Sequence, residues 1–269
     1  MRFHPDILGY LEQEVQPQMK QLEDGAPQGS IIICAHNEQD VLPATLAAVA
    51  QVSTRVSLEV IGVDNASTDA TGEIFAAAGV HCIDQPRKGL SYARAAGLEA
   101  ARSELIFQTD ADTIVPTTWI EAHRRHYQED DGLVGVSGGI KYLGAHWSHC
   151  LYGLGEKAFT EFYALVKKRR KKCIGGANLS FKRQSVLDTG GIRLGADLGE
   201  DLILFSQIAE QGRTLIDTGP EITVGTDGRR FDTAPKMAAH TKARVMNIMR
   251  RLRYSGIFPE GQNFNDVRG

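Results

Sequence analysis

The chain has 269 residues, of which 42% are hydrophobic, and this allows one large core or a core with an appendage. Its formal net charge is only -3, so we predict no nucleic-acid partner. The four cysteines lack the paired spacing of metal or redox motifs, which indicates free thiols in a reducing compartment such as the cytoplasm. Neither a secretory signal nor the roughly 20 apolar residues of a membrane-spanning helix is expected from the sequence.

An N-terminal extension, residues 1–29, precedes the first apolar run, and its end at 23–30 has the composition of a linker. From Ser30 onward, short apolar runs alternate with stretches of helical periodicity. Pro43 suits the first turn of a helix, and Gly79 suits a helix end. We predict strands at 30–35, 58–63, 80–84 and 104–109, and helices at 40–52, 70–79 and 91–102. This order predicts an α/β fold with a mainly parallel sheet and helices on both faces.

Polar residues follow the end of each predicted strand. Ligands of open parallel sheets bind beyond the carboxyl ends of the strands, where successive loops meet. Four loops are therefore expected to bring charged or amide groups to one rim. Asp69 and Asn65 also suit a simple helix-capping role. The rim residues are His36, Asn37, Glu38, Asp64, Asn65, Arg87, Lys88, Asp110 and Asp112.

Asp110 and Asp112 end the fourth predicted strand. On an extended segment, side chains two positions apart point the same way, so both carboxylates would face one space while Ala111 points back into the protein. Carboxylates that close repel each other unless a cation lies between them. Mg²⁺ or Mn²⁺, completed by water and substrate phosphates, would remove this conflict. Solvated or helix-capping acids are the alternative explanation.

Six segments carry a family resemblance in their order and spacing. They are "CAHNEQDVLPATLAAV", "VDNASTDAT", "RKGLSYARAAGLEAA", "FQTDADT", "GGANLSFKR" and "LGEDLILFSQIAEQG". Together they resemble the family 2 glycosyltransferases, nucleotide-sugar enzymes with the GT-A fold. The resemblance covers about Ser30 to Gly212. It implies a nucleotide-sugar-binding half at 30–132, an acceptor-binding and catalytic-base half at 133–233, and a C-terminal helical tail at 234–269.

The resemblance implies roles for the donor-side residues. Residues 35–38 would line the nucleoside pocket, and Asp64 would reach the base or the ribose. Lys88, Gly89 and Arg94 would flank the base and the diphosphate. Asp112 would be the main ligand of Mg²⁺ or Mn²⁺, with Asp110 nearer the ribose. The predicted donor-binding residues are Ala35, Asn37, Glu38, Asp64, Lys88, Arg94, Asp110 and Ala111.

The resemblance also implies an acceptor side. The segment at 175–178 resembles the turn where glycines let the backbone approach the sugar. Asp201 would be the catalytic base. Glu200 and Asp201 are adjacent at an apparent helix start, so their side chains diverge by roughly 100° and cannot share one role. A favourable interaction with the helix N-terminus is the alternative for both. The predicted acceptor-side residues are Gly175, Gly176, Asn178 and Glu200.

These roles predict an inverting transfer of one sugar from a nucleotide sugar, uridine being the commoner base in the family, to a glycan or lipid-linked acceptor. Asp201 would take the proton of the acceptor hydroxyl. Two departures leave the base of the nucleotide open: the second motif has Asp-Asn-Ala-Ser instead of Asp-Asp-Gly-Ser, and Ala95 replaces the usual asparagine. A Gln-x-x-Arg-Trp motif is missing from the sequence, which disfavours a processive polysaccharide synthase.

Several features have two interpretations. His36, His123 and His126 could be metal ligands, although surface roles are commoner. Arg229 and Arg230 follow a short strand, and one of them either faces an anionic ligand or lies on the surface. The basic segments 167–172 and 241–254 are either a solvated loop and a packed helix, or contacts to anionic lipid at the inner face of the membrane.

Other protein classes are less compatible with the sequence. The turn after the first strand, "AHNEQD", contains no glycine, which argues against a nicotinamide dehydrogenase. The phosphate-binding loop of NTPases is also missing from the sequence. A non-catalytic GT-A-like module that binds a nucleotide is the remaining alternative, although it would not need Asp201 as a base.

Overall fold

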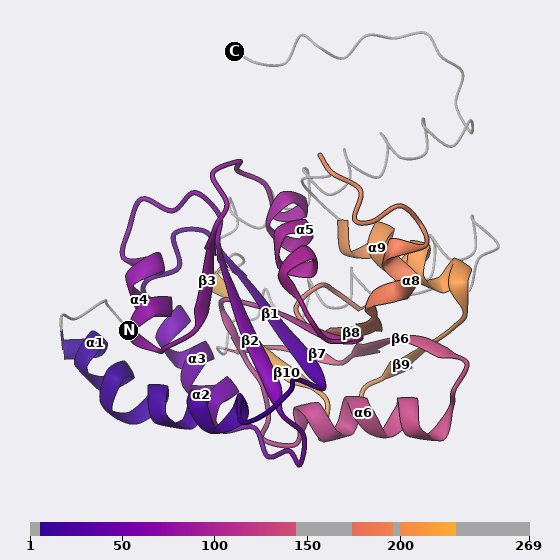
Figure 1. The fold of residues 1–269 in the computed structure, drawn as a ribbon, viewed down its shortest axis with the longest axis horizontal. Helices are drawn as coiled ribbons and strands as arrows, with labels where there is room; N and C mark the ends of the chain where they lie inside the picture. Colours follow the sequence, from indigo (N-terminus) through magenta and orange to yellow (C-terminus); the bar gives the residue numbers. More distant parts are fainter. Residues whose placement is uncertain (1–5, 144–173, 196–199, 230–269) are drawn as a thin grey trace, which may run out of the picture.

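A seven-stranded sheet forms the centre of the molecule, in the order β3-β2-β1-β4-β8-β6-β9. The computed structural model describes residues 6–143, 174–195 and 200–229 (Figure 1). Strand β8 runs antiparallel to β4 and β6, and the other four pairings are parallel, so the predicted mainly parallel sheet is confirmed. The strands are β1 (Gly29–Ala35), β2 (Leu58–Asp64), β3 (His81–Asp84), β4 (Leu105–Asp110), β6 (Leu133–Gly138), β8 (Leu179–Lys182) and β9 (Arg213–Asp217).

Helices cover both faces of this sheet (Figure 1). Because successive side chains of a strand point to opposite faces, Ile31 and Ile33 of β1 pack into one core and Ile32 and Cys34 into the other. The first core is covered by α3 (Leu42–Ala50), α4 (Thr71–Ala77) and α6 (Trp119–Glu129), and the second by α5 (Leu90–Ala100), α8 (Arg183–Leu187) and α9 (Glu200–Gln211).

The predicted elements from Ser30 to Asp110 are all present, with ends that differ by at most two residues. Pro43 is in the first turn of α3, where its missing N–H costs no helical hydrogen bond. Gly79 follows α4 with φ of +72°, the left-handed conformation that favours glycine at a helix end.

The N-terminal segment belongs to the main core, which the sequence did not predict. Residues 6–22 form α1 (Asp6–Tyr10), a π-helical turn η1 (Leu11–Val15) and α2 (Gln16–Leu22). Leu11, Val15 and Met19 are at most 2% exposed and lie in the same cluster as α3 and α4. The described part of the predicted extension therefore helps to bury the half of the sheet that contains β1 and β2.

A small second sheet lies beside the end of β4. It contains β5 (Thr113–Ile114), β10 (Val224–Asp227) and β7 (Ile140–Leu143), in that order. Strands β6, β8 and β9 extend the central sheet beyond β4, so the two predicted halves share one sheet. The basic segments 167–172 and 241–254 and the tail 234–269 lie outside the described residues.

Candidate active site

The carboxyl ends of the central strands lie side by side. The register of the sheet pairs Ala35 with Asp64 and Cys34 with Asp110, and it pairs Asp64 with Asp84 at the end of β3. The loops that follow β1, β2, β3 and β4 therefore leave the sheet at one rim, as predicted.

Hydrogen bonds lock the first two of these loops together. Asn37, at a φ of +54°, accepts a hydrogen bond from the backbone N–H of Thr68 at 2.8 Å. The backbone N–H of Glu38 donates to the hydroxyl of Thr71 at 2.9 Å. The Asp64 carboxylate accepts a backbone N–H three residues further on, at 3.1 Å. The predicted nucleoside loops are thus held in place by their own polar side chains.

Asn65 fixes the third loop. Its side-chain N–H groups donate to the backbone oxygens of Gln85 and Arg87 at 3.1 and 2.8 Å, and its oxygen accepts from the N–H of Gly89 at 2.8 Å. Gly89 has φ of +139° at the start of α5, a backbone conformation that other residues rarely adopt. Asn65 therefore stabilises the third loop. The exposed Lys88 lies at the rim between Arg87 and Gly89, two residues that Asn65 contacts.

Arg94 lies inside the protein, although the sequence predicted that it flanks the base and diphosphate. Its side chain is 2% exposed, and its guanidinium donates to Glu200 Oε1 at 2.6 Å and to Asp110 Oδ1 at 3.3 Å. Burial alone would lower the pKa of Arg94, but the two carboxylates raise it above its ordinary value. Glu200 is 7% exposed, so its predicted acceptor-side position is also corrected to a buried one.

Asp201 is held by the glycine turn that precedes β8. Its Oδ2 accepts the backbone N–H of Gly176 at 2.9 Å, and its Oδ1 accepts the N–H of Leu202 at 2.8 Å. The carbonyl of Gly176 in turn accepts a hydrogen bond from the buried Gln108 of β4 at 2.9 Å. A Cβ built on Gly175 would lie 2.9 Å from the Cδ1 of Ile140, so Gly175 packs closely against that side chain. The turn and the predicted base therefore form one unit.

Asn178 was predicted on the acceptor side, but it is 0% exposed. Its oxygen accepts from the indole N–H of Trp119 and contacts His123 Nε2, both at 2.9 Å. Its N–H groups donate to the backbone oxygens of Gly139 and Ile222 at 2.8 and 2.7 Å. All its polar capacity is used inside the core, so we exclude Asn178 from the site. His123 is likewise a core residue.

The two acids at the end of β4 do not lie on one extended segment. The strand ends at Asp110, and residues 111–112 form a turn before β5, so the predicted geometry is wrong in this respect. Ala111 points inward as predicted, because it is 3% exposed. Asp112 is 5% exposed, and its Oδ1 accepts a hydrogen bond from the Thr226 hydroxyl at 3.2 Å. The two carboxylates therefore have separate partners.

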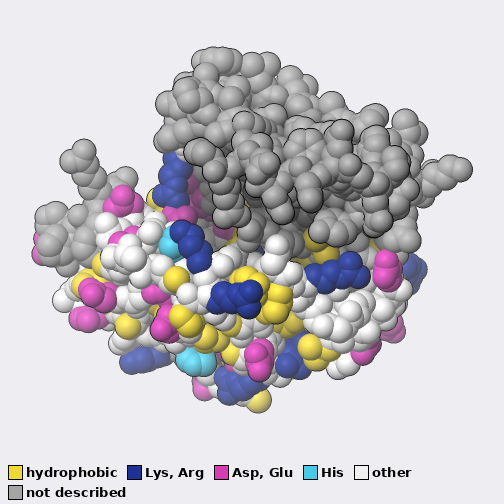
Figure 2. Space-filling view, turned by 90° about the horizontal axis from the view of Figure 1, so that it is seen from above, with side chains coloured by type: hydrophobic (Ala, Val, Ile, Leu, Met, Phe, Trp, Pro, Cys, Tyr) yellow, Lys and Arg dark blue, Asp and Glu magenta, His cyan; other side chains and the backbone are white. Residues whose placement is uncertain are grey.

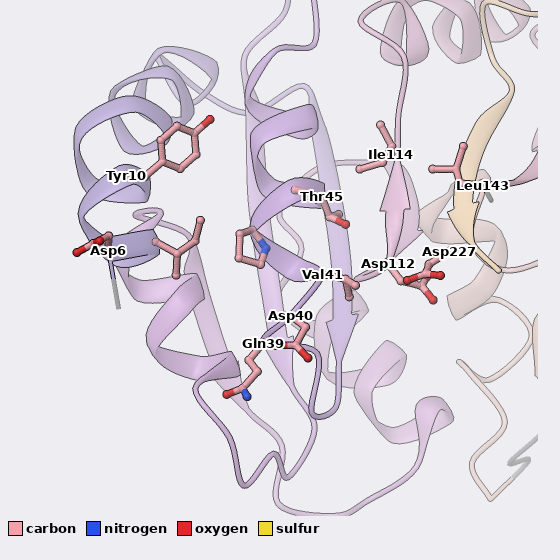
Figure 3. Close-up of a pocket in the computed structure, with 13 residues that line it drawn as sticks. Asp6, Tyr10, Gln39, Asp40, Val41, Thr45, Asp112, Ile114, Leu143 and Asp227 are labelled. Atoms are coloured by element: carbon pink, nitrogen blue, oxygen red, sulfur yellow. The ribbon is translucent and has the colours of Figure 1, made fainter. Parts of the chain in front are cut away.

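A pocket of about 610 Å³ borders Asp112. Figure 3 shows Asp112 and Asp227 side by side at one end of this pocket, with Asp6 and Tyr10 of α1 at the other end. Mg²⁺ and Mn²⁺ bind one or two carboxylates and take their remaining ligands from water and substrate phosphates. Asp112 and Asp227 therefore fit such an ion. Within the described ranges no group of three or more His, Cys, Asp or Glu side chains forms a complete metal cage.

Three residues near the acids were missed or left open by sequence analysis. Arg229 pairs with Glu38 of the first loop, which decides against a free surface position. Thr226 and Asp227 are joined to the acidic turn, since the backbone N–H of Asp227 donates to the Asp112 carbonyl at 3.0 Å. The sequence of the short strand β10 contains no motif from which these contacts could have been predicted. Gln108 was a fourth missed residue, and its signal was an amide that directly follows three apolar residues in a buried strand.

Comparison with known protein families agrees with this arrangement. The family model described as glycosyl transferase family 2 matches residues 30–189, more than half of the chain. The chain belongs to glycosyl transferase family 2. The match includes all four loops at the rim, of which the acidic turn is the fourth, and it ends before α9, which carries Asp201.

Curated relatives of this family 2 protein match over shorter stretches. A glucosyl-dolichyl phosphate glucuronosyltransferase of Haloferax volcanii is 28% identical over 121 residues, which are 42% of this chain and 36% of the relative. An uncharacterized glycosyltransferase of Mycobacterium bovis is 34% identical over 83 residues, 31% of this chain and 36% of the relative. The matches thus span about a third of the length of these relatives.

Solved structures share the fold over most of the chain. The mannosyltransferase PcManGT of Pyrobaculum calidifontis, in complex with GDP-Man and Mn²⁺, has a TM-score of 0.63 at 18% identity, with 96% of this chain and 75% of that chain covered. Glucosyl-3-phosphoglycerate synthase of Mycobacterium tuberculosis, with Mn²⁺ and UDP-glucose, has a TM-score of 0.60 at 15% identity, with coverages of 94% and 85%. The GT-A fold predicted for this family 2 protein is thereby confirmed.

The described surface of this family 2 protein adds two observations. On the face shown in Figure 2, the coloured Lys and Arg side chains are interspersed with acidic and neutral ones. Among residues 6–143, 174–195 and 200–229, no helix has the length and apolar character needed to span a bilayer.

Proposed function

We propose that this protein is an inverting glycosyltransferase that moves one sugar from a nucleoside-diphosphate sugar, most simply a UDP-sugar, to a hydroxyl of a glycan or lipid-linked acceptor. One observation carries the proposal: Asp201 is hydrogen-bonded to the turn that also packs against Arg94, the partner of Asp110. The predicted base and the predicted donor site are therefore two sides of one packed cluster.

The hydrogen bonds of Asp201 suit a general base. Each carboxylate oxygen accepts one backbone N–H, which fixes the orientation of the group and leaves lone pairs for a substrate hydroxyl. In the transfer, the acceptor oxygen bonds to the anomeric carbon as the bond from that carbon to the diphosphate oxygen breaks. The hydroxyl proton passes to Asp201, and the nucleoside diphosphate leaves from the opposite face, which inverts the anomeric centre.

The charges at the rim favour a divalent cation. Asp110, Glu200 and Asp201 surround Arg94, and Asp112 of the acidic turn adds another carboxylate. A bare diphosphate next to this cluster would be repelled by its excess of acids. Asp112, with Asp227 beside it, would hold Mg²⁺ or Mn²⁺, which when bound offsets the charge that develops on the departing diphosphate.

A thermal-shift panel of UDP, GDP, CDP and ADP, each with and without Mn²⁺, tests the donor side. A ligand that binds only the folded state raises the melting temperature in proportion to its affinity and concentration. We expect a shift with UDP that requires Mn²⁺. Release of UDP from UDP-sugars, with and without candidate acceptors, then tests catalysis. Binding without release or transfer would favour the non-catalytic nucleotide-binding module, and no shift with any nucleotide would reject the proposal.

A further inference from the structure

Arg94 is the single cation at the centre of the described site, and it contacts both halves of that site. It lies on α5, and its two terminal nitrogens bind different carboxylates: Nη1 binds Glu200, the first residue of α9, and Nη2 binds Asp110, the last residue of β4. The side chains of Arg94 and Glu200 are 2% and 8% exposed, whereas that of Asp110 is 24% exposed. The guanidinium therefore joins the acidic turn to the start of the helix that carries Asp201.

The glycine turn encloses the same guanidinium. A Cβ built on Gly176 would lie 2.2 Å from Arg94 Nη2, so only glycine fits while the guanidinium stays in place. The N–H of Gly176 donates to Asp201 Oδ2, so a shift of this turn would move the carboxylate that it holds. Arg94 thus reaches Asp201 by two routes, through the adjacent Glu200 and through the packed Gly176.

We propose that Arg94 is a positioning residue that sets the predicted base Asp201 against the donor-side acid Asp110, and that it is not a ligand of the donor diphosphate. This inference rests on the proposed glycosyl transfer. Burial supports it, because both terminal nitrogens are already committed to carboxylates inside the protein. A planar guanidinium can bind two carboxylates in different directions, and the compact ammonium of lysine cannot reproduce that fork.

Two variants separate positioning from diphosphate binding. Arg94→Lys keeps the charge and loses the fork. The double variant Arg94→Met/Glu200→Gln removes both charges of the buried ion pair at once. Neither Arg94 nor Glu200 is then left as a buried charge without the other. In both we expect UDP affinity in the presence of Mn²⁺, measured by calorimetry, to stay within about threefold of wild type. The turnover number for release of UDP from saturating UDP-glucose should fall at least about tenfold, because small displacements of a reacting group have large kinetic costs.

A matched control lies just beyond the C-terminal end of the same helix. Arg102, two residues after α5, forms an ion pair with the buried Glu59 at 2.7 Å, at the opposite end of α5 from the rim. Arg102→Met should leave both affinity and turnover near wild type, and thermal unfolding of every variant confirms that it is folded. If wild type prefers GDP, then GDP and GDP-mannose replace the uridine probes.

The outcomes are distinct. Reduced turnover with retained nucleotide affinity in a folded Arg94→Lys or double variant supports positioning. A loss of UDP affinity of tenfold or more in Arg94→Lys would show that Arg94 binds the diphosphate, and unchanged turnover in both variants would show that its position is immaterial; either result overturns the inference. Failure of the proposed function is recognised separately, because wild type would then either bind neither UDP nor GDP with Mn²⁺ or bind the nucleotide without releasing it from its sugar.

Discussion

Asp201 is the residue on which the proposed chemistry depends most directly. Its neighbour Glu200 is buried against Arg94, and burial raises the pKa of Glu200 while the guanidinium opposes that rise. Asp201 is partly exposed and is held by backbone N–H groups. The adjacent acids thus lie in separate environments, Glu200 against Arg94 inside the protein and Asp201 on backbone N–H groups.

Asp201→Asn tests the base with almost no change in shape. The amide cannot take the acceptor proton, so we expect transfer to fall by about 10²-fold or more, the usual contribution of a general base. Nucleotide affinity should stay near wild type, since Asp201 is not expected to contact the donor phosphates. Transfer assays and calorimetry with UDP and Mn²⁺ measure the two quantities. The exposed Asp188, bonded to Gln184, gives the control Asp188→Asn, and near-normal transfer in Asp201→Asn would reject the assignment.

At the scale of elements, strand β10 holds the acidic turn in place. Thr226 pairs with Thr113 across β10 and β5, and its hydroxyl is the donor to Asp112 Oδ1. The partners that orient a metal ligand commonly affect metal affinity by 10- to 100-fold. Thr226 therefore links a strand without a sequence motif to the predicted metal ligand.

Thr226→Val removes this hydroxyl and keeps the shape of the side chain. We expect Mn²⁺ to bind about tenfold more weakly in the presence of UDP, as measured by titration calorimetry, because the Asp112 carboxylate loses a partner that orients it. Thr226→Ser should keep most of the affinity. Thr223→Val is a matched control, since that hydroxyl donates to the Gly219 carbonyl at 2.7 Å and is not bonded to Asp112. Equal affinities in all three variants would contradict this role.

The alternating strands and helices up to Asp110 could be predicted from local signals. These signals are the apolar periodicity, Pro43 at a helix start and Gly79 at a helix end. Long-range contacts could not be predicted in this way. No local pattern shows that β8 enters the sheet antiparallel between β4 and β6. The family resemblance marked Asn178 by its place in a motif, but its hydrogen bonds inside the core come from α6, from Gly139 between β6 and β7, and from the loop before β10.

At the scale of the whole molecule, a buried polar network contributes to the stability of the fold. The first core holds a hydrogen-bonded chain that includes His123, whose Nδ1 lies 2.8 Å from the Ser180 hydroxyl. The Ser180 hydroxyl is also 3.0 Å from that of Tyr127. Such a network is stable only when each member has its partners, so the protonation of His123 affects global stability.

Burial lowers the pKa of His123 to about 4, so the folded state holds this imidazole neutral. The unfolded chain takes up a proton below about pH 6.5, and the stability present above that pH is lost as the pH falls toward 4. From this group we expect the free energy of unfolding to drop by about 2 kcal/mol between about pH 7 and about pH 5. Urea unfolding at the two pH values measures the drop.

His123→Gln should lower stability at both pH values but remove most of the difference between them. The exposed His81 on β3 supplies the matched control, because His81→Gln leaves the buried network intact and should keep the wild-type drop. The lowered pKa values of Glu59, Glu121 and Asp217 act in the more acidic range where carboxylates titrate. If the free energy of unfolding of His123→Gln still drops by the wild-type amount between the two pH values, then protonation of His123 is not the cause of the pH dependence of stability in this range.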